Sequence, residues 1–170
     1  MKRILSCSKK KVSKPYSAVE MARLMVYMAR PQKVYIDVRE LDRLLFLAQS
    51  YHYIINRSFL FDDTIYVRDE ELYIPAVRKL YHSFGNSYLV QSERYVEFNK
   101  DDPWASKWRY IDIDAYPPEV IKTIDDVIDM VKVHGIPDFV GGFIPTNENI
   151  LTPYTIARLL YTLKNTSAQS

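Results

Sequence analysis

The three histidines are the residues of this chain that come closest to catalytic or metal-binding chemistry. His52, His82 and His134 lie on three different predicted helices, and none has a histidine four residues on or a cysteine partner. A metal site therefore has little support. His52 could reach Asp62 if the turn between them folds back, which would join a base to an orienting carboxylate. Because no nucleophile or oxyanion motif accompanies this pair, packing in or at the edge of the core is the expected role of each histidine.

Other catalytic patterns are missing from the sequence. Its four glycines form neither a P-loop nor a dinucleotide-binding motif. The acidic pair Asp62-Asp63 has the groups for acid–base work, but adjacent surface carboxylates usually have no such role. We therefore expect a protein that is not an enzyme and that needs neither a cofactor nor a metal.

Positive charge is concentrated at the beginning of the chain. Six of the 23 basic residues and none of the 21 acidic ones lie in the first 14 positions, which leaves 17 basic against 21 acidic residues and a net charge of −4 in the remainder. Residues 1–15 are predicted to be a flexible basic tail. Binding of a phosphate backbone needs a basic face, so nucleic acid is an unlikely partner except through this tail.

Cysteine usage and hydropathy indicate the compartment. Cys7 is the only cysteine in 170 residues, so no disulfide can form within one chain, which fits a reducing environment. No apolar run approaches the roughly 18–20 residues of a membrane span. The sequence predicts a cytoplasmic protein without a membrane partner.

A central helix over residues 37–55 is the element expected to position the rest. Apolar side chains recur along it at helical spacing, and others spread around the remaining surface, so several elements should cover it. The stripe consists of Leu41, Leu44, Leu45, Ala48, Tyr51, His52 and Ile55.

The elements around this helix follow from capping and periodicity. Ser17 with Glu20, and Asp37 with Glu40, have capping-box form and predict the starts of a helix over 18–29 and of the central helix. Further helices are predicted over 75–84, 118–134 and 152–163, with a strand at 64–68 and a β-hairpin from 95–98 and 108–113. The fold class is therefore α+β: a predominantly helical single domain over residues 16–164, with a small β-hairpin or short antiparallel strands, and a disordered tail at 165–170.

The stretch from Asp37 to Gly85 resembles the Panacea domain, a phage- and plasmid-associated family that includes SocA-like antitoxins. The family shows a helix of the form KLQKLLYFAQGW, then PLFDE, a strand, a Gly-Pro-Val turn and a VPEVYREYK helix. In this chain Glu40–Tyr51, Phe59–Asp63 and Ile74–Tyr81 match the first, second and last of these in order and spacing. A looser likeness continues through residues 119–135 and 152–161.

The resemblance implies a non-enzymatic protein that neutralises a cognate toxin or delivers it to a protease as an adaptor. Two departures stand out: Glu71-Leu72-Tyr73 replaces Gly-Pro-Val, and residues 88–116 are longer and richer in aromatics than expected. Both favour an alternative, in which a phage-encoded inhibitor of a host defence protein uses the same fold. The identity of the partner and the oligomeric state stay open.

The segment from Tyr66 to Tyr73 is the predicted partner-binding surface. Aromatic residues beside charged ones are typical of compact interfaces, and the family pattern is broken here. The alternative is that the two tyrosines only attach the strand to the core while the acids are solvated. The candidate residues are Tyr66, Arg68, Glu70, Glu71, Tyr73 and Arg78.

Overall fold

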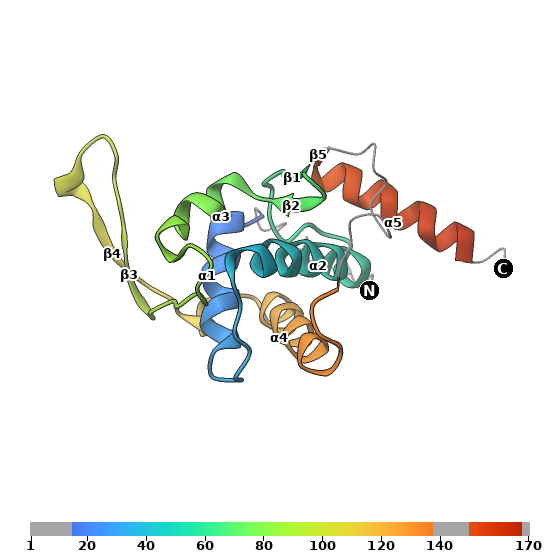
Figure 1. Cartoon of the computed structure of the whole chain (residues 1–170), viewed down its shortest axis with the longest axis horizontal. Coiled ribbons are helices and arrows are strands. Elements are labelled where there is room, and N and C mark those ends of the chain that lie inside the picture. The colour runs from blue at the N-terminus through green and yellow to red at the C-terminus, as the bar shows by residue number, and fades with distance from the viewer. Residues whose placement is uncertain (1–14, 138–149, 168–170) are drawn as a thin grey trace, which may run out of the picture.

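The computed structural model describes residues 15–137 and 150–167, with side chains as far as residue 161 (Figure 1). Residues 1–14 of the predicted basic tail lie outside this range, as do residues 138–149, which include Gly141 and Gly142. Helices and short antiparallel strands make up the fold, which confirms the predicted α+β class. The elements are α1 (Ala18–Ala29), α2 (Val38–Asn56), β1 (Ile65–Arg68), β2 (Glu71–Tyr73), α3 (Pro75–Leu80), β3 (Arg94–Glu97), β4 (Lys107–Tyr110), α4 (Pro118–His134), β5 (Ile150–Leu151) and α5 (Pro153–Ser167).

Both predicted capping boxes are present. The Ser17 hydroxyl accepts a hydrogen bond from the Glu20 amide, and the Glu20 carboxylate accepts one from the Ser17 amide, each at 3.2 Å. Asp37 and Glu40 make the same reciprocal pair, at 2.9 and 2.8 Å. These bonds satisfy amide groups that would otherwise have no partner in the first helical turn, so α1 and α2 begin where the sequence predicted.

Helix α2 is the centre of the core, as expected. It contacts α1, α3, α4, α5 and β2, and the predicted core residues Leu41, Leu44, Leu45 and Ala48 are fully buried. The apolar stripe ends earlier than predicted, because Ile55 is 61% exposed. The last turn of α2 extends past the elements that cover the rest of the helix.

Gln49 of α2 fixes the chain that follows the helix. Its amide group donates to the carbonyl of Phe61 at 2.8 Å, and its carbonyl accepts from the amide of Leu60 at 2.8 Å. Leu60 in turn accepts a hydrogen bond from the backbone amide of Tyr16. One buried amide side chain therefore attaches two separate segments to the central helix.

The strands form two separate sheets. In the first, of order β2-β1-β5, β1 pairs antiparallel with both neighbours. The sequence predicted only β1 here, because the acids at the start of β2 are poor strand formers. In the second, β3 and β4 form the predicted hairpin, and Figure 1 shows this pair extending away from the helices.

The structure differs from the sequence prediction at the ends of two helices and in the burial of three leucines. The helix expected over 75–84 ends at Leu80 and continues as a 3₁₀ turn over His82–Phe84. Helix α5 continues to Ser167, so residues 165–167 are helical rather than part of a disordered tail. Leu80, Leu159 and Leu160, which helical spacing placed in the core, are only partly buried at its edge.

Leu45→Asp should unfold the protein. A carboxylate without a partner in this fully buried position costs several kcal/mol, against a total stability of about 5–15 kcal/mol. The matched control is Ile55→Asp, the same change at an exposed position of the same helix, which should melt almost like the wild type. Circular dichroism melts measure both, and a cooperative, near-normal melt for Leu45→Asp would contradict the core assignment.

Candidate partner-binding surface

The β1–β2 hairpin has one buried face and one outward face. Register places Tyr66 opposite Tyr73 and Arg68 opposite Glu71. The side chains that alternate with them, Ile65 and Leu72, are buried. We call the outward group the hairpin face; it consists of Tyr66, Arg68, Glu71 and Tyr73. Tyr66 is 40% exposed and Tyr73 is partly buried, so each presents part of its ring to solvent.

The turn between the two strands has an unusual backbone. Asp69 and Glu70 both have positive φ, 51° and 61°, a conformation that two-residue hairpins usually assign to Asn, Asp or Gly. Glu70 is not one of these residues and adopts it at an energetic cost. The turn therefore holds two exposed carboxylates at the end of the hairpin, next to the predicted binding residues.

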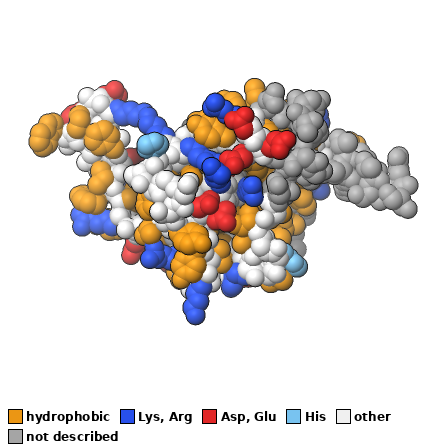
Figure 2. Space-filling model, in the orientation of Figure 1, with side chains coloured by type: hydrophobic (Ala, Val, Ile, Leu, Met, Phe, Trp, Pro, Cys, Tyr) orange, Lys and Arg blue, Asp and Glu red, His pale blue; other side chains and the backbone are white. Residues whose placement is uncertain are grey.

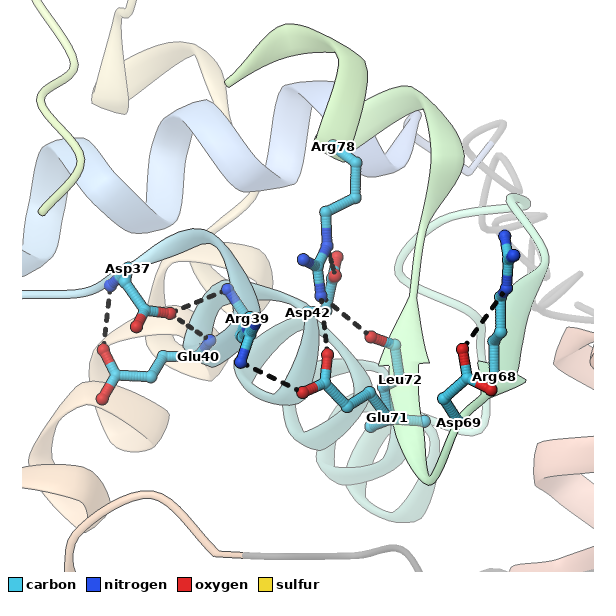
Figure 3. Close-up of polar contacts among 9 residues, drawn as sticks. All are labelled: Asp37, Arg39, Glu40, Asp42, Arg68, Asp69, Glu71, Leu72 and Arg78. Atoms are coloured by element: carbon cyan, nitrogen blue, oxygen red, sulfur yellow. Dashed lines mark hydrogen bonds and ion pairs between the residues drawn. The ribbon is translucent and has the colours of Figure 1, made fainter. Parts of the chain in front are cut away.

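Arg78 connects the hairpin face to the central helix. Figure 3 shows its guanidinium reaching from α3 to α2 and β2. Nε lies 2.5 Å from Oδ2 of Asp42, and Nη2 donates to the carbonyl of Leu72 at 3.3 Å. Nη2 also lies 3.9 Å from a carboxylate oxygen of Glu71, which pairs with Arg39 at 3.4 Å. One side chain thus joins three elements beneath the face.

Asp42 anchors this network inside the protein. It is 0% exposed, and its Oδ1 has no hydrogen-bond partner among the described residues. Burial raises the pKa of Asp42 to about 7, and it outweighs the lowering effects of the Arg78 guanidinium and the Ile74 amide. Sequence reasoning did not single out Asp42. The sequence could have indicated Asp42, because it lies within a helix that was predicted to be covered on several sides. A carboxylate buried there needs a cation as a partner.

The six predicted residues fall into three groups. Tyr66, Arg68, Glu71 and Tyr73 form the hairpin face, whereas Glu70 lies in the exposed turn. The side chain of Arg78 is only 20% exposed, and its guanidinium carbon lies 5.7 Å from the centre of the Tyr73 ring. Arg78 therefore packs beneath Tyr73 and exposes little surface to a partner.

The neighbours of His52 include hydroxyl groups, and not the Asp62 carboxylate that the sequence suggested. It is buried, and its ring nitrogens lie 2.8 Å from the Thr123 hydroxyl and 3.3 Å from the Ser58 hydroxyl. These contacts, rather than Asp62, satisfy the ring and join α2 to α4. Burial also lowers the pKa of His52, which favours the neutral ring. Among the described residues, no three His, Cys, Asp or Glu side chains cluster as metal ligands.

Comparison with known proteins finds no match for this chain. No family model, no curated protein and no solved structure matches the chain. In the part of the chain that the structure describes, no helix has the length and apolar character needed to cross a membrane.

The raised pKa of Asp42 should appear as a pH dependence of stability. Between about pH 4 and pH 7 the folded protein keeps a proton on Asp42 that the unfolded chain releases, so the free energy of unfolding falls as pH rises. The slope from one such group is at most about 1.4 kcal/mol per pH unit. Asp42→Asn removes this group, so the stability of the wild type minus that of the variant should decline over this range in urea titrations. A difference that grows with pH would mean that the folded-state pKa is depressed instead.

Proposed function

We propose that this chain is a non-enzymatic protein-binding module that neutralises a cognate toxin, or delivers it to a protease as an adaptor. The observation that carries the proposal is the hairpin face, on which Tyr66 lies opposite Tyr73 and Arg78 lies beneath the Tyr73 ring. The Panacea-like motifs from Asp37 to Gly85 support the same proposal from the sequence.

The chemistry of the hairpin face suits a protein partner. Tyrosines supply a large contact area with little loss of conformational entropy, and they are enriched among residues that dominate binding energy. The bonds from Arg78 to Asp42 and Leu72 hold the hairpin before any partner arrives, which reduces the cost of ordering on binding. The exposed acids Asp69 and Glu70 favour a partner with basic side chains at the rim.

The alternative is a phage-encoded inhibitor of a host defence protein built on the same fold. The observation that favours it is the β3–β4 hairpin, whose exposed Trp104, Trp108 and Tyr110 lie in the segment that departs from the family pattern.

Gene context separates the two proposals. A toxic product of the adjacent gene that this protein neutralises on co-expression supports the antitoxin, and a failure to restore growth overturns it.

Tyr73→Ala should weaken binding of that adjacent gene product by roughly thirtyfold, because a tyrosine that dominates an interface contributes about 2 kcal/mol or more. Isothermal titration calorimetry measures the affinity. The matched control is Tyr35→Ala, at an exposed tyrosine on another part of the surface, which should bind like the wild type. A thermal melt of each variant completes the test.

The melt distinguishes the two roles left open for Tyr73. A large loss of affinity with an almost unchanged melting temperature assigns the ring to the interface. Equal losses of stability and affinity assign it to attachment of the strand to the core. If neither quantity changes, the hairpin face does not contact the partner.

A further inference from the structure

The β3–β4 hairpin is an arm with two chemically different sides. Register pairs Arg94 with Tyr110 and Val96 with Trp108 on one side. The other side carries Tyr95, Glu97, Lys107 and Arg109. There Arg109 and Glu97 form an ion pair at 2.6 Å, and Tyr95 lies beneath Arg23 of α1 at 4.0 Å. The second side is therefore internally paired and faces the body at its base.

The first side, which we call the aromatic face, consists of Arg94, Val96, Trp108 and Tyr110. Trp108 is 57% and Tyr110 60% exposed, and Val96 is also exposed. Between the two strands, toward the tip, Phe98 and Trp104 are also exposed, at 64% and 97%. Figure 2 shows hydrophobic side chains at the end of the arm. Contiguous exposed aromatics of this kind mark interaction surfaces.

Arg94 is the one charged side chain of the aromatic face. Its guanidinium carbon lies 3.8 Å from the centre of the Trp108 ring and 6.0 Å from that of Tyr110. No carboxylate pairs with Arg94 among the described residues. The face thus offers stacked rings and a cation near the base of the arm that can still accept an acidic partner.

We propose that the aromatic face is a dimer interface, occupied by the same face of a second copy of this chain. This inference goes beyond the proposed function, because it concerns the protein alone. In the two-fold arrangement the arms run antiparallel and face to face, with Phe98 near the symmetry axis and Trp108 beside it. Such an interface is self-complementary by construction, since each patch meets its own copy.

Charge complementarity supports a second copy as the occupant. An antiparallel pair brings the base of one arm to the tip of the other, so Arg94 meets the exposed acids Asp101 and Asp102. From Glu93 to Tyr110 the arm holds four basic and four acidic side chains. Two arms therefore do not repel each other. The same charge balance leaves no positively charged groove on the arm. A nucleic-acid strand that stacked on the aromatic rings would also need such a groove for its phosphates.

The available area fits a moderately stable dimer. An aromatic side chain buries about 150–250 Å², so the exposed parts of Phe98, Trp108 and Tyr110 amount to roughly 400 Å² per copy. Two copies with their rims reach the roughly 1,000 Å² at which specific interfaces begin. Two strands alone are also marginally stable in water, and face-to-face packing would stabilise both arms. Interfaces at this lower limit of size are typical of weak, transient association, so we expect a dissociation constant on the order of micromolar.

Sedimentation equilibrium of the full chain tests the proposal without any partner. Between about 1 and 200 µM the wild type should pass from monomer to dimer, as a micromolar dissociation constant requires. Trp108→Ala should raise this constant at least tenfold. The control is Arg109→Ala on the opposite side of the same strand, which should leave it unchanged. Circular dichroism melts of each variant confirm that the body is folded.

A charge exchange tests the antiparallel arrangement. Arg94→Glu should weaken the dimer, because it places acid against Asp101 and Asp102. Adding Asp101→Lys to that variant should restore much of the association; Asp102 is kept because its carboxylate accepts the Trp104 amide at 3.1 Å. A failure to restore it would overturn the antiparallel register.

Three results would overturn self-association through this face. The wild type could remain a monomer at every concentration. The dimer could be insensitive to Trp108→Ala, which would place its interface elsewhere. A monomer whose binding of the adjacent gene product is lost in Trp108→Ala would give the aromatic face to that partner instead. The dimer measurement needs no partner, so its failure leaves the proposed function standing.

Discussion

Three buried polar side chains of α2 that bond to other segments are the constraint on which the rest of the structure depends. Asp42, Gln49 and His52 are all buried within the central helix, where a polar group without a partner costs several kcal/mol. Each finds its main partner on a different segment: Arg78 of α3, the backbone of Leu60 and Phe61, and Thr123 of α4. Hydrophobic burial brings these segments to α2, but it has no direction. The three polar contacts determine where along the helix each segment lies.

The Arg78–Asp42 contact carries this constraint to the surface. Arg78 also holds the carbonyl of Leu72 and lies near Glu71, so the position of β2 depends on a carboxylate inside the core. Near pH 7, where Asp42 is partly ionised, replacing the pair by apolar side chains would often preserve stability, but here it would also free the strand that presents Tyr73. The pair is therefore better explained by placement of the hairpin than by stability alone.

Local signals in the sequence were sufficient for most elements, and contacts between elements were not. The capping boxes at Ser17 and Asp37, with helical spacing behind them, located α1 and α2 because both signals act within a few residues. Periodicity could not show that Ile55 has no cover or that Asp42 has a distant arginine, because each depends on how other segments pack. Five of the six candidate residues lie on one hairpin and Arg78 packs beneath it. The sequence predicted only the first strand of that hairpin, and the support of Tyr73 by Arg78 and Asp42 crosses three elements.

The backbone at the base of the arm has an evolutionary consequence. The amide of Ile111 donates to the carbonyl of Glu93 at 2.8 Å, so the chain leaves the body and returns to it at almost the same point. A segment whose ends lie this close can be lengthened, shortened or exchanged while the surrounding core stays in place. Homologues could thus acquire or lose the whole arm through a single insertion or deletion, and its aromatic residues could diversify without any compensating change in α2.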